Sequence, residues 1–223
     1  MDEPVVTVKQ GKLQGAVLKS VLGPSYIAFR GIPYAAPPIG ELRFKDPQPC
    51  IPWTGIKDTS KYVGSLCTQK LLFPPRDIIG HEDCLHLNVY TNSIQQSKPV
   101  IFWIHGGSFV TGTGNYESMR PDYMLAKDVV FVSCNYRLGA FGFLNLEHRA
   151  APGNQGLKDL IAALEWVKEN IANFGGDPNN VTINGASAGG ALAHAISISP
   201  LARGTSTAFS LPLITLLNIT GGT

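Results

Sequence analysis

Apolar and β-branched residues occur along this chain in short runs, and the spacing of the runs changes near residue 85. Before that point, three runs separated by turn residues predict β-strands. They cover Val5 to Val8, Lys12 to Leu18 and Ser25 to Gly31. Six prolines between Ile32 and Trp53 then predict a loop-rich stretch, because proline fixes its own backbone and cannot donate a ladder hydrogen bond.

After residue 85, strand-like runs alternate with helical patterns. Alternating polarity in His86 to Thr91 predicts a half-exposed strand. The nearly continuous apolar runs of Pro99 to His105 and Val129 to Tyr136 predict strands that are buried on both faces. Apolar residues at helical spacing in Gly156 to Phe174 predict an amphipathic helix. Its apolar side consists of Leu157, Leu160, Ile161, Leu164, Val167 and Ile171.

A further strand, Asn180 to Gly185, and a further helix, Ser187 to Ser197, continue the alternating order. This order predicts an α/β fold with a mixed, mostly parallel sheet, in which the N-terminal strands are antiparallel. The chain has 223 residues, of which 44% are apolar and 15% charged, so a substantial core is expected within one large or two small domains.

The charge pattern and the apolar runs exclude two classes of partner. The net charge is +2 without any basic block, so nucleic acid is not an expected partner. No apolar run approaches the roughly 18 to 20 residues of a membrane-spanning helix. The N-terminal "MDEPVVTVKQ" is acidic and has no apolar core region. No secretory signal is therefore predicted, so the chain as written would be cytoplasmic, and the sequence leaves its compartment open.

Four cysteines are present, and no C-x-x-C pair occurs among them, so their spacing does not suit a zinc site. Cys67 and Cys84 enclose a short polar loop. A disulfide between them would stabilise the fold by about 3 kcal/mol in the chain-entropy model. The sequence alone leaves both a disulfide and two free thiols open.

The stretch "VTINGASAGG" places Ser187 between two glycines, with a predicted strand before it and a predicted helix after it. A nucleophile elbow has this arrangement, because a tight strand-to-helix turn holds the serine hydroxyl clear of the sheet. Side chains at positions 185 and 189 would clash with the neighbouring strand or helix, which explains Gly185 and Gly189. An ordinary glycine turn is the alternative interpretation.

A second glycine pair, Gly106 and Gly107, follows a predicted buried strand in "WIHGGSF". Adjacent glycines let backbone N–H groups point at one spot, as an oxyanion hole requires. In α/β-hydrolases the hole combines an N–H of this loop with the N–H after the nucleophile. The candidate donors here are Gly106, Gly107 and Ala188, and His105 is expected to order the loop. A flexible glycine turn is the alternative.

Several sequence blocks, in their order along the chain, resemble the type-B carboxylesterase and cholinesterase family of α/β-hydrolases. Among its members, the chain is most similar to insect-type general esterases. The resemblance runs from about Val5 to Arg203. Its blocks are "FRGIPYAAPPIGELRF", "EDCLHLNVYT", "PVIFWIHGGSF", "NYRLGAFGFL", "GNQGLKD", "ALEWVKENIANFGGDPNNVTINGASAGG" and "SPLARG".

The resemblance implies an α/β-hydrolase fold and the hydrolysis of a small-molecule carboxylic ester, without a cofactor or metal, through an acyl-enzyme on Ser187. It also implies a disulfide between Cys67 and Cys84. Two structural ion pairs of the family are matched here by Arg43 with Glu82 and by Arg137 with Asp159. Breaking a buried pair on one side costs about 3 to 5 kcal/mol.

The chain also departs from the family pattern. Ala186 stands where the family usually has glutamate beside the nucleophile. In the family, the acid and the histidine of the triad follow the serine, but His194 is the only histidine after Ser187, and no Asp or Glu follows it. Seven residues along a helix place His194 roughly 10 Å further along the axis, too far for a base.

The base and the acid of the triad are therefore missing from this sequence. We expect an esterase portion in residues 1–204, truncated after the elbow helix, and a divergent tail in residues 205–223. Two functions remain open. One is an ester hydrolase by descent that is weak or inactive as this isolated chain. The other is a non-catalytic truncated or binding product of an esterase gene. An unrelated α/β domain with structural glycines is the third interpretation.

Overall fold

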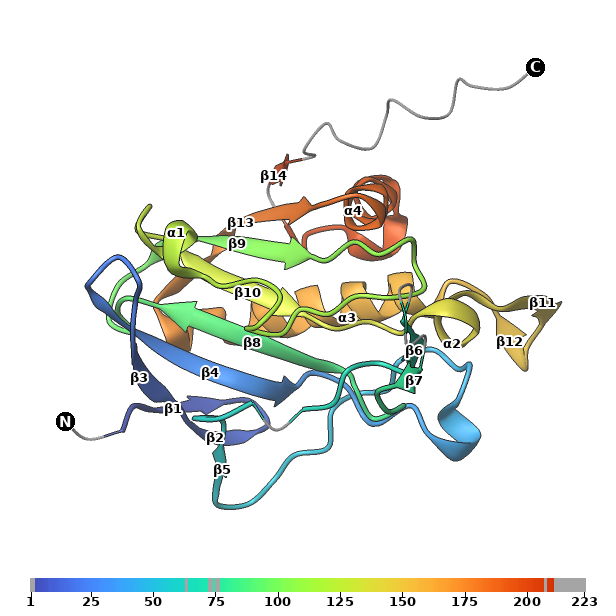
Figure 1. Cartoon of the computed structure of the whole chain (residues 1–223), viewed down its shortest axis with the longest axis horizontal. Helices are drawn as coiled ribbons and strands as arrows, with labels where there is room; N and C mark the ends of the chain where they lie inside the picture. Colours follow the sequence, from blue (N-terminus) through green and yellow to red (C-terminus); the bar gives the residue numbers. More distant parts are fainter. Residues whose placement is uncertain (1–2, 63, 72–73, 75–76, 207, 211–223) are drawn as a thin grey trace.

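A computed structural model describes residues 3–62, 64–71, 74, 77–206 and 208–210. Its centre is a seven-stranded sheet in the order β14-β13-β9-β10-β8-β4-β3 (Figure 1). The strands of this sheet are β3 (Ala16–Lys19), β4 (Ser25–Pro33), β8 (His86–Thr91), β9 (Lys98–Ile104), β10 (Val130–Cys134), β13 (Gly176–Gly185) and β14 (Ala208–Ser210).

The direction of the strands divides this sheet into two parts. Neighbours from β14 through β13 and β9 to β10 are parallel, whereas neighbours from β10 through β8 and β4 to β3 are antiparallel. The mixed α/β class with antiparallel N-terminal strands is therefore confirmed. β13, β9 and β10 end at the same edge of the sheet, so the segments that follow β9 and β13 lie next to each other.

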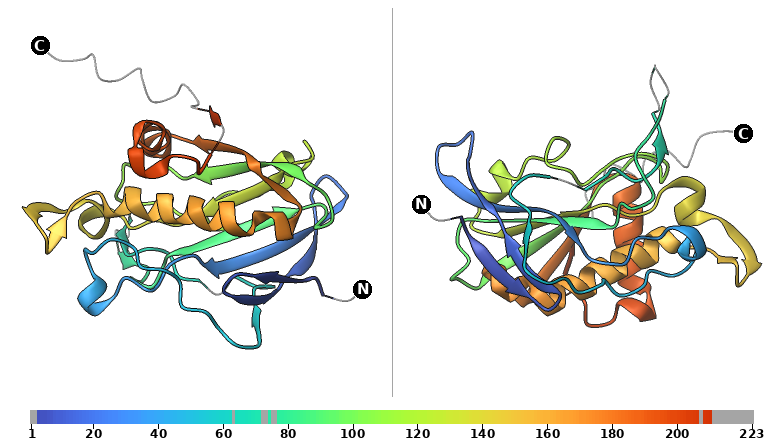
Figure 2. Two further views of the ribbon diagram at one scale, coloured as in Figure 1. Left: turned by 180° about the vertical axis from the view of Figure 1, so that it is seen from behind. Right: turned by 90° about the horizontal axis from the view of Figure 1, so that it is seen from below.

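Helix α3 crosses one face of the sheet, as the view from behind shows (Figure 2). Its predicted apolar side is confirmed, because Leu160, Leu164 and Val167 are fully buried, while Leu157 is half-buried. The short 3-10 helix that follows α3 ends at Gly175, whose φ of +77° lies in the left-handed region. The helices are α1 (Asp122–Leu125), α2 (Gly139–Phe143), α3 (Gln155–Asn170), α4 (Ala188–Ile198) and the 3-10 helices η1 (Gly40–Leu42), η2 (Ile171–Phe174) and η3 (Pro200–Ala202).

Shorter strands form three smaller sheets around this centre. They are the three-stranded sheet of β1 (Val5–Val8), β2 (Gly11–Gln14) and β5 (Ile56–Asp58), the pair of β6 (Gln69–Lys70) and β7 (Ile78–Ile79), and the pair of β11 (Asn145–His148) and β12 (Ala151–Pro152). The predicted single strand from Lys12 to Leu18 is wrong. It divides at Gly15, where a Cβ atom would lie 2.7 Å from the carbonyl oxygen of Ala28, and its two halves join different sheets.

The predicted half-exposed character of β8 is also wrong, because its residues from Leu87 to Thr91 are all buried. The strand lies inside the sheet, and the amide of Asn88 is satisfied there. The side-chain oxygen of Asn88 accepts a hydrogen bond from the Gly31 N–H at 2.9 Å, and its amide donates to Gly114 at 3.0 Å. Buried polar residues of this kind imitate the alternating pattern of an exposed strand.

β10 is buried along its whole length, as predicted, but β9 is not. Pro99 is exposed, and Ile101 and Trp103 are only half-buried against a small cluster around Tyr90. The other face of β9, with Val100, Phe102 and Ile104, belongs to the main core under α3. One face of this strand is thus less covered than its apolar sequence predicted.

The chain after α4 continues through η3 to β14, which pairs with β13 from Thr182 opposite Ala208 to Asn184 opposite Ser210. The predicted tail of residues 205–223 thus begins with a short strand at the edge of the sheet (Figure 1). Residues 211–223 lie outside the described part of the chain. Among the described residues, no helix is long and apolar enough to cross a membrane.

Candidate active site

Ser187 occupies the turn between β13 and α4, and its backbone has φ +54° and ψ −124°. A positive φ is uncommon for a residue with a side chain and costs about 1 to 3 kcal/mol, so the surrounding structure must impose it. The side chain of Ser187 is exposed, although residues 188 to 190 are buried. The turn therefore presents the hydroxyl to solvent at the edge of the sheet where β9, β10 and β13 end.

The two glycines of the turn are required by close backbone contacts. A Cβ atom at Gly185 would lie 2.3 Å from the carbonyl oxygen of Gly189. A Cβ atom at Gly189 would lie 2.2 Å from the carbonyl oxygen of Ile104 at the end of β9. The structure thus places both glycines where the sequence reasoning expected a clash, one against the helix and one against the adjacent strand.

The loop after β9 brings Gly106 and Gly107 to the serine turn. A Cβ atom at Gly106 would lie 2.7 Å from the carbonyl oxygen of Ala186 and 3.0 Å from Cβ of Ser187. Gly107 has φ +116°, and its carbonyl oxygen accepts hydrogen bonds from the N–H groups of Val110 and Thr111, both at 3.0 Å. The loop is therefore a closed turn packed directly against Ser187.

The three candidate oxyanion donors have N–H groups that are available to a ligand. Within the described residues, no carbonyl or side chain accepts a hydrogen bond from the N–H of Gly106, Gly107 or Ala188. Ala188 is the first residue of the 11-residue helix α4, whose N-terminal dipole favours negative charge. Together these groups form a surface beside Ser187 that can stabilise an anionic oxygen.

His105 is buried under this loop. Its ring stacks on Tyr136 with 4.4 Å between ring centroids, and Nδ1 donates to the carbonyl oxygen of Gly106 at 2.8 Å. The Tyr136 hydroxyl in turn donates to the carbonyl oxygen of His105 at 3.0 Å. Burial lowers the pKa of His105 to about 4, so the ring is neutral at pH 7. These contacts fit the predicted ordering role of His105, and Tyr136 is a supporting residue that the sequence reasoning missed.

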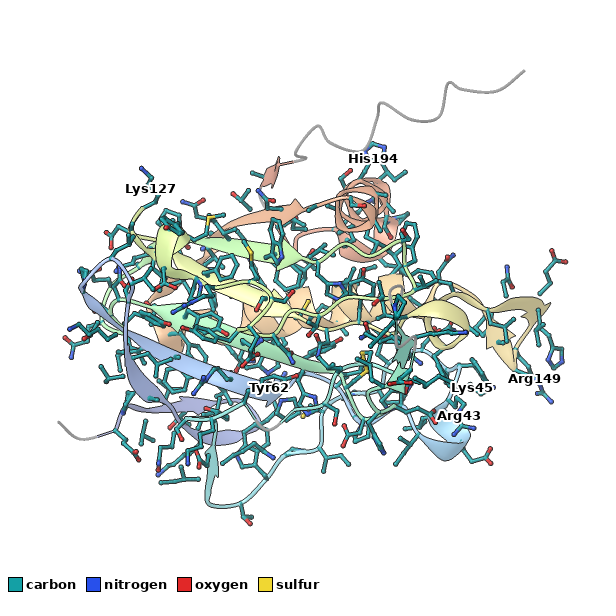
Figure 3. The ribbon with its side chains drawn as sticks, viewed as in Figure 1. Arg43, Lys45, Tyr62, Lys127, Arg149 and His194 are labelled. Atoms are coloured by element: carbon teal, nitrogen blue, oxygen red, sulfur yellow. A yellow bond between two sulfur atoms is a disulfide. The ribbon has the colours of Figure 1, made fainter. Side chains whose placement is uncertain are left out.

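No described side chain forms a hydrogen bond with the Ser187 hydroxyl. His194 lies on α4 and is exposed, at the outer surface of the helix (Figure 3). His81 and His148 are also exposed, and His86 is half-buried on β8. The described part of the chain therefore brings together the candidate nucleophile and the candidate oxyanion donors, but it does not place a histidine base on the serine.

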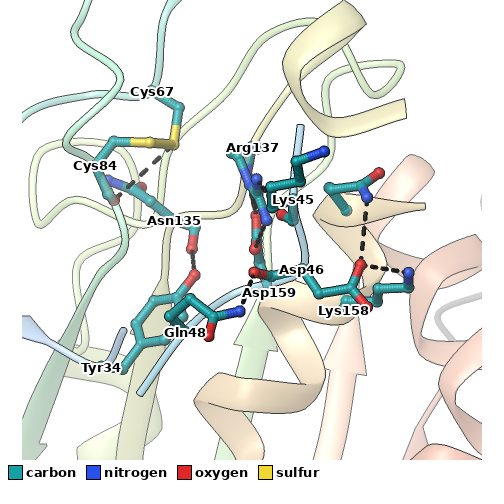
Figure 4. Close-up of polar contacts among 11 residues, drawn as sticks. Tyr34, Lys45, Asp46, Gln48, Cys67, Cys84, Asn135, Arg137, Lys158 and Asp159 are labelled. Carbon is teal, nitrogen blue, oxygen red and sulfur yellow. Dashed lines mark hydrogen bonds and ion pairs between the residues drawn. A yellow bond between two sulfur atoms is a disulfide. The ribbon is translucent and has the colours of Figure 1, made fainter. Parts of the chain in front are cut away.

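The loop that carries the family disulfide also borders this region. Cys67 and Cys84 are joined by a disulfide with 4.9 Å between their Cα atoms, which confirms the predicted pairing. Cys50 and Cys134 are free thiols, and Cys134 is fully buried. Figure 4 shows the disulfide beside the segment of Asn135, whose carbonyl oxygen accepts a hydrogen bond from the Tyr34 hydroxyl at 2.7 Å.

Arg137 and Asp159 form a buried ion pair that connects the segment after β10 to α3 (Figure 4). Nε and Nη2 of Arg137 donate to the two carboxylate oxygens at 2.8 and 2.6 Å, and the Arg137 backbone N–H donates to the same carboxylate at 3.0 Å. The side chains are 3% and 0% exposed. This bidentate arrangement satisfies both charges inside the protein.

Arg43 and Glu82 form the second pair, at 2.5 and 2.6 Å, but this pair is not buried. The side chains are 43% and 22% exposed, and Arg43 lies at the surface (Figure 3). The prediction that both family pairs are buried is therefore wrong for this one. Solvent screening leaves an exposed pair with little effect on stability.

Gln69 is a further residue near the site that the sequence reasoning missed. It is 7% exposed and lies on β6, inside the disulfide loop, with its amide directed at residues 111 and 112. No local sequence signal pointed to it, because its partners Thr111 and Gly112 lie 42 and 43 positions away.

Comparison with known proteins gives this arrangement a context. A profile described as the carboxylesterase family matches residues 2–209. Juvenile hormone esterase of Tribolium castaneum is 46% identical over 208 residues, which cover 90% of this chain and 34% of the relative. Para-nitrobenzyl esterase of Bacillus subtilis is 41% identical over 217 residues, which cover 92% of this chain and 42% of the relative.

Among solved structures, juvenile hormone esterase from Manduca sexta with OTFP covalently attached is similar, with a TM-score of 0.88 and 38% identity. The match covers 94% of this chain and 41% of that chain. This similarity confirms the predicted α/β-hydrolase fold. The chain spans only about a third to two fifths of the length of the proteins that it matches.

Proposed function

Because this chain belongs to the carboxylesterase family, we propose that it carries the nucleophile and the oxyanion groups of a carboxylic ester hydrolase. The observation that carries this proposal is the strained backbone of Ser187, at φ +54°, which presents an exposed side chain. Gly106 is packed against that side chain. Strain of this kind at a strand-to-helix turn supports a nucleophile, because strained residues cluster at active sites and a nucleophile elbow holds its serine in this way.

In the proposed reaction, Oγ of Ser187 attacks the ester carbonyl carbon. The Oγ–C bond forms, the π pair moves to the carbonyl oxygen, and the serine proton passes to a base. When the intermediate collapses, the C–O bond to the leaving alcohol breaks, and the alcohol takes up a proton. Water then attacks the acyl-enzyme, releases the carboxylic acid and restores the serine hydroxyl.

The N–H groups of Gly106, Gly107 and Ala188 are proposed to donate to the negative oxygen of the intermediate. Removing one such donor from an acyl-transfer enzyme costs about 10² to 10³ in rate. The closed turn at Gly107 and the buried start of α4 hold these donors in place before a substrate arrives. Preorganised donors stabilise the developing charge without a cost of reorganisation during the reaction.

The base is the part of the site that the described residues do not provide. In α/β-hydrolases the acid and then the histidine follow the serine along the chain. The matched relatives are longer than this chain, which spans 34% and 42% of two of them. The proposal for this chain is accordingly limited to the attacking serine and the oxyanion donors.

For the substrate we propose a small-molecule carboxylic ester. The names of the relatives include a juvenile hormone esterase, a para-nitrobenzyl esterase and a fatty acyl-CoA hydrolase. These names differ in the acyl group and in the leaving group, which is a thiol in an acyl-CoA, and share acyl transfer to water. The support for this chain is therefore the class of reaction.

The test is the intact mass of the folded chain after exposure to a fluorophosphonate that labels activated serines. We expect one adduct, formed slowly because no described residue places a base on Ser187, and absent from Ser187→Ala. Ser197→Ala is the matched control, because Ser197 lies on α4 with its hydroxyl donating to the carbonyl oxygen of His194. An adduct retained in Ser187→Ala contradicts the assignment of the nucleophile.

The second candidate function is a non-catalytic product of an esterase gene. The observation that favours it is that no described side chain accepts a hydrogen bond from the Ser187 hydroxyl. A folded chain that forms no adduct supports this second function. A chain that forms the adduct at Ser187 refutes it.

A further inference from the structure

Residues 105–112, which follow β9 and include Gly106 and Gly107, are called the oxyanion loop. Gln69 is connected to this loop by three of its four side-chain hydrogen bonds. Its Oε1 accepts from the Thr111 hydroxyl at 2.6 Å and from the Gly112 N–H at 2.8 Å. Its Nε2 donates to the carbonyl oxygen of Gly112 at 2.9 Å and to that of Cys67 at 3.0 Å. Every hydrogen-bonding position of the amide is therefore used, although the side chain is buried.

Thr111 lies directly behind Gly107. A Cβ atom at Gly107 would lie 1.9 Å from the carbonyl oxygen of Thr111, and the Thr111 N–H donates to the carbonyl oxygen of Gly107 at 3.0 Å. Fixing Thr111 thus fixes the Gly107–Ser108 peptide, which directly follows the proposed donor N–H of Gly107. The hydroxyl of Thr111 is held by Gln69, so this side of Gly107 depends on the amide, while the peptide that carries the Gly107 N–H includes the carbonyl oxygen of Gly106.

Gly112 lies in the same way behind Gly106 and His105. A Cβ atom at Gly112, where φ is +116°, would lie 2.4 Å from the carbonyl oxygen of Gly106 and 2.4 Å from Nδ1 of His105. Gln69 holds both the N–H and the carbonyl group of Gly112. The backbone of residue 112 therefore cannot rotate or withdraw without breaking two hydrogen bonds to a buried side chain.

We infer that Gln69 is a positioning residue that fixes the two oxyanion glycines through Thr111 and Gly112. The inference rests on the proposed function of Gly106 and Gly107. Gln69 touches neither the nucleophile nor the place where an ester would bind, and it acts through the loop. Its bond to the carbonyl oxygen of Cys67 ties this loop to the disulfide segment, more than 40 residues earlier in the chain.

The residue type follows from this role. Residues 67 and 112 each offer Gln69 a carbonyl oxygen, while Thr111 and Gly112 each offer a donor. A neutral amide can donate two hydrogen bonds and accept two at this length. A carboxylate accepts only, so Gln69→Glu would place charge against two carbonyl oxygens. Gln69→Met keeps the approximate length and removes all four bonds.

The first experiment measures hydrogen exchange of the peptide that covers residues 105–112. In Gln69→Met, we expect the amides of Val110, Thr111 and Gly112 to exchange at least about tenfold faster than in the wild type. Gln155→Met is the matched control. Gln155 is 1% exposed, donates to Asp46 at 3.3 Å, and lies on α3 outside the loop. We expect no change at 105–112 in this control.

The second experiment measures the rate of fluorophosphonate labelling at Ser187. We expect Gln69→Met to lower the maximal labelling rate by about tenfold to a hundredfold, with the half-saturating probe concentration unchanged. Thr111→Val removes a single bond to Gln69 and guards against a Gln69 variant that does not fold. Thr111→Val should reproduce part of both effects. Thr111→Ser keeps the hydroxyl and should restore the wild-type exchange and labelling rates.

The two experiments separate this inference from the proposed function. If the wild type is not labelled, the proposed function fails, and hydrogen exchange alone decides the role of Gln69. Unchanged exchange at residues 105–112 in folded Gln69→Met or Thr111→Val overturns the inference. The inference is equally overturned if Gln155→Met, at a stability equal to that of Gln69→Met, slows labelling or speeds exchange at residues 105–112 as much as Gln69→Met does.

Discussion

The carbonyl oxygen of Ile104 lies 2.2 Å from the position that a Cβ atom would take at Gly189. This contact joins the end of β9, which leads into the loop of Gly106 and Gly107, to the first turn of α4, which follows Ser187. Because the contact leaves no room for a side chain, α4 can start directly against the strand. The distance between the oxyanion loop and the serine is thereby set by the backbone.

Gly189→Ala should therefore destabilise the fold by about 3 kcal/mol, the upper end of the usual cost of overpacking. The added methyl group meets backbone, which cannot rotate away as a flexible side chain would. The measurement is the free energy of unfolding in urea. Gly204→Ala is the control, since Gly204 has φ +80° but nothing within 4 Å of a Cβ atom. It should cost only about 1 to 2 kcal/mol, from backbone strain. Equal losses would refute the steric argument.

Ser187→Ala should leave the free energy of unfolding within about 0.5 kcal/mol of the wild type. The hydroxyl is exposed, and it makes no capping hydrogen bond at the start of α4. Ser187→Gly should be more stable than Ser187→Ala by about 1 kcal/mol, because glycine relieves the strained backbone.

The matched control for this gain is Ala191→Gly, an exposed position on the same helix. There the backbone is ordinary helix, and glycine should cost about 1 kcal/mol. Thermal or urea unfolding of the three variants gives the comparison. A Ser187→Gly variant that loses stability as Ala191→Gly does would show that the turn stores no strain.

Arg137→Met should destabilise the fold by about 3 to 5 kcal/mol, because it leaves the fully buried carboxylate of Asp159 without its partner. Arg43→Met should cost much less than Arg137→Met, since Arg43 is 43% exposed and its pair is screened by solvent. Urea unfolding of the two variants at the same pH tests the difference. Similar losses would mean that burial does not distinguish the two pairs.

The strands and helices that frame the site were predictable from the sequence. The β-branched run before Ser187 and the small residues after it are local signals. They predicted the strand and the helix that the structure has there as β13 and α4. The closeness of Gly106 to Ser187 followed from strand order, because segments after parallel neighbouring strands meet at one edge. The order of motifs along the chain therefore carried most of the information about the nucleophile and the oxyanion loop.

The supporting contacts were not predictable in the same way. Gln69 and Thr111 have ordinary residue types and are separated by 42 positions, so no local pattern connects them. Asn88 looked like an exposed position because its partners, Gly31 and Gly114, are distant in sequence. Burial of polar residues depends on tertiary partners, and a single sequence does not show which partners are near.

The pH dependence of stability should report the burial of His105. Its pKa is about 4 in the folded chain, against about 6.5 in an unfolded one, so the unfolded state binds more protons between these values. Stability should therefore fall as the pH drops below about 6.5, by about 2 kcal/mol at pH 5 from this group. His86, whose pKa is also lowered by burial, changes stability in the same direction.

His105→Phe separates the two histidines, because a phenyl ring keeps the stacking on Tyr136 and does not titrate. The wild type and the variant are compared by urea unfolding at pH 7.5 and pH 5. The variant should lose about 2 kcal/mol less than the wild type over this range. Aspartates whose pKa is lowered, such as Asp58, lose their contribution only near pH 4 and below, outside the window. An equal loss in both proteins would mean that His105 titrates normally and is accessible to water.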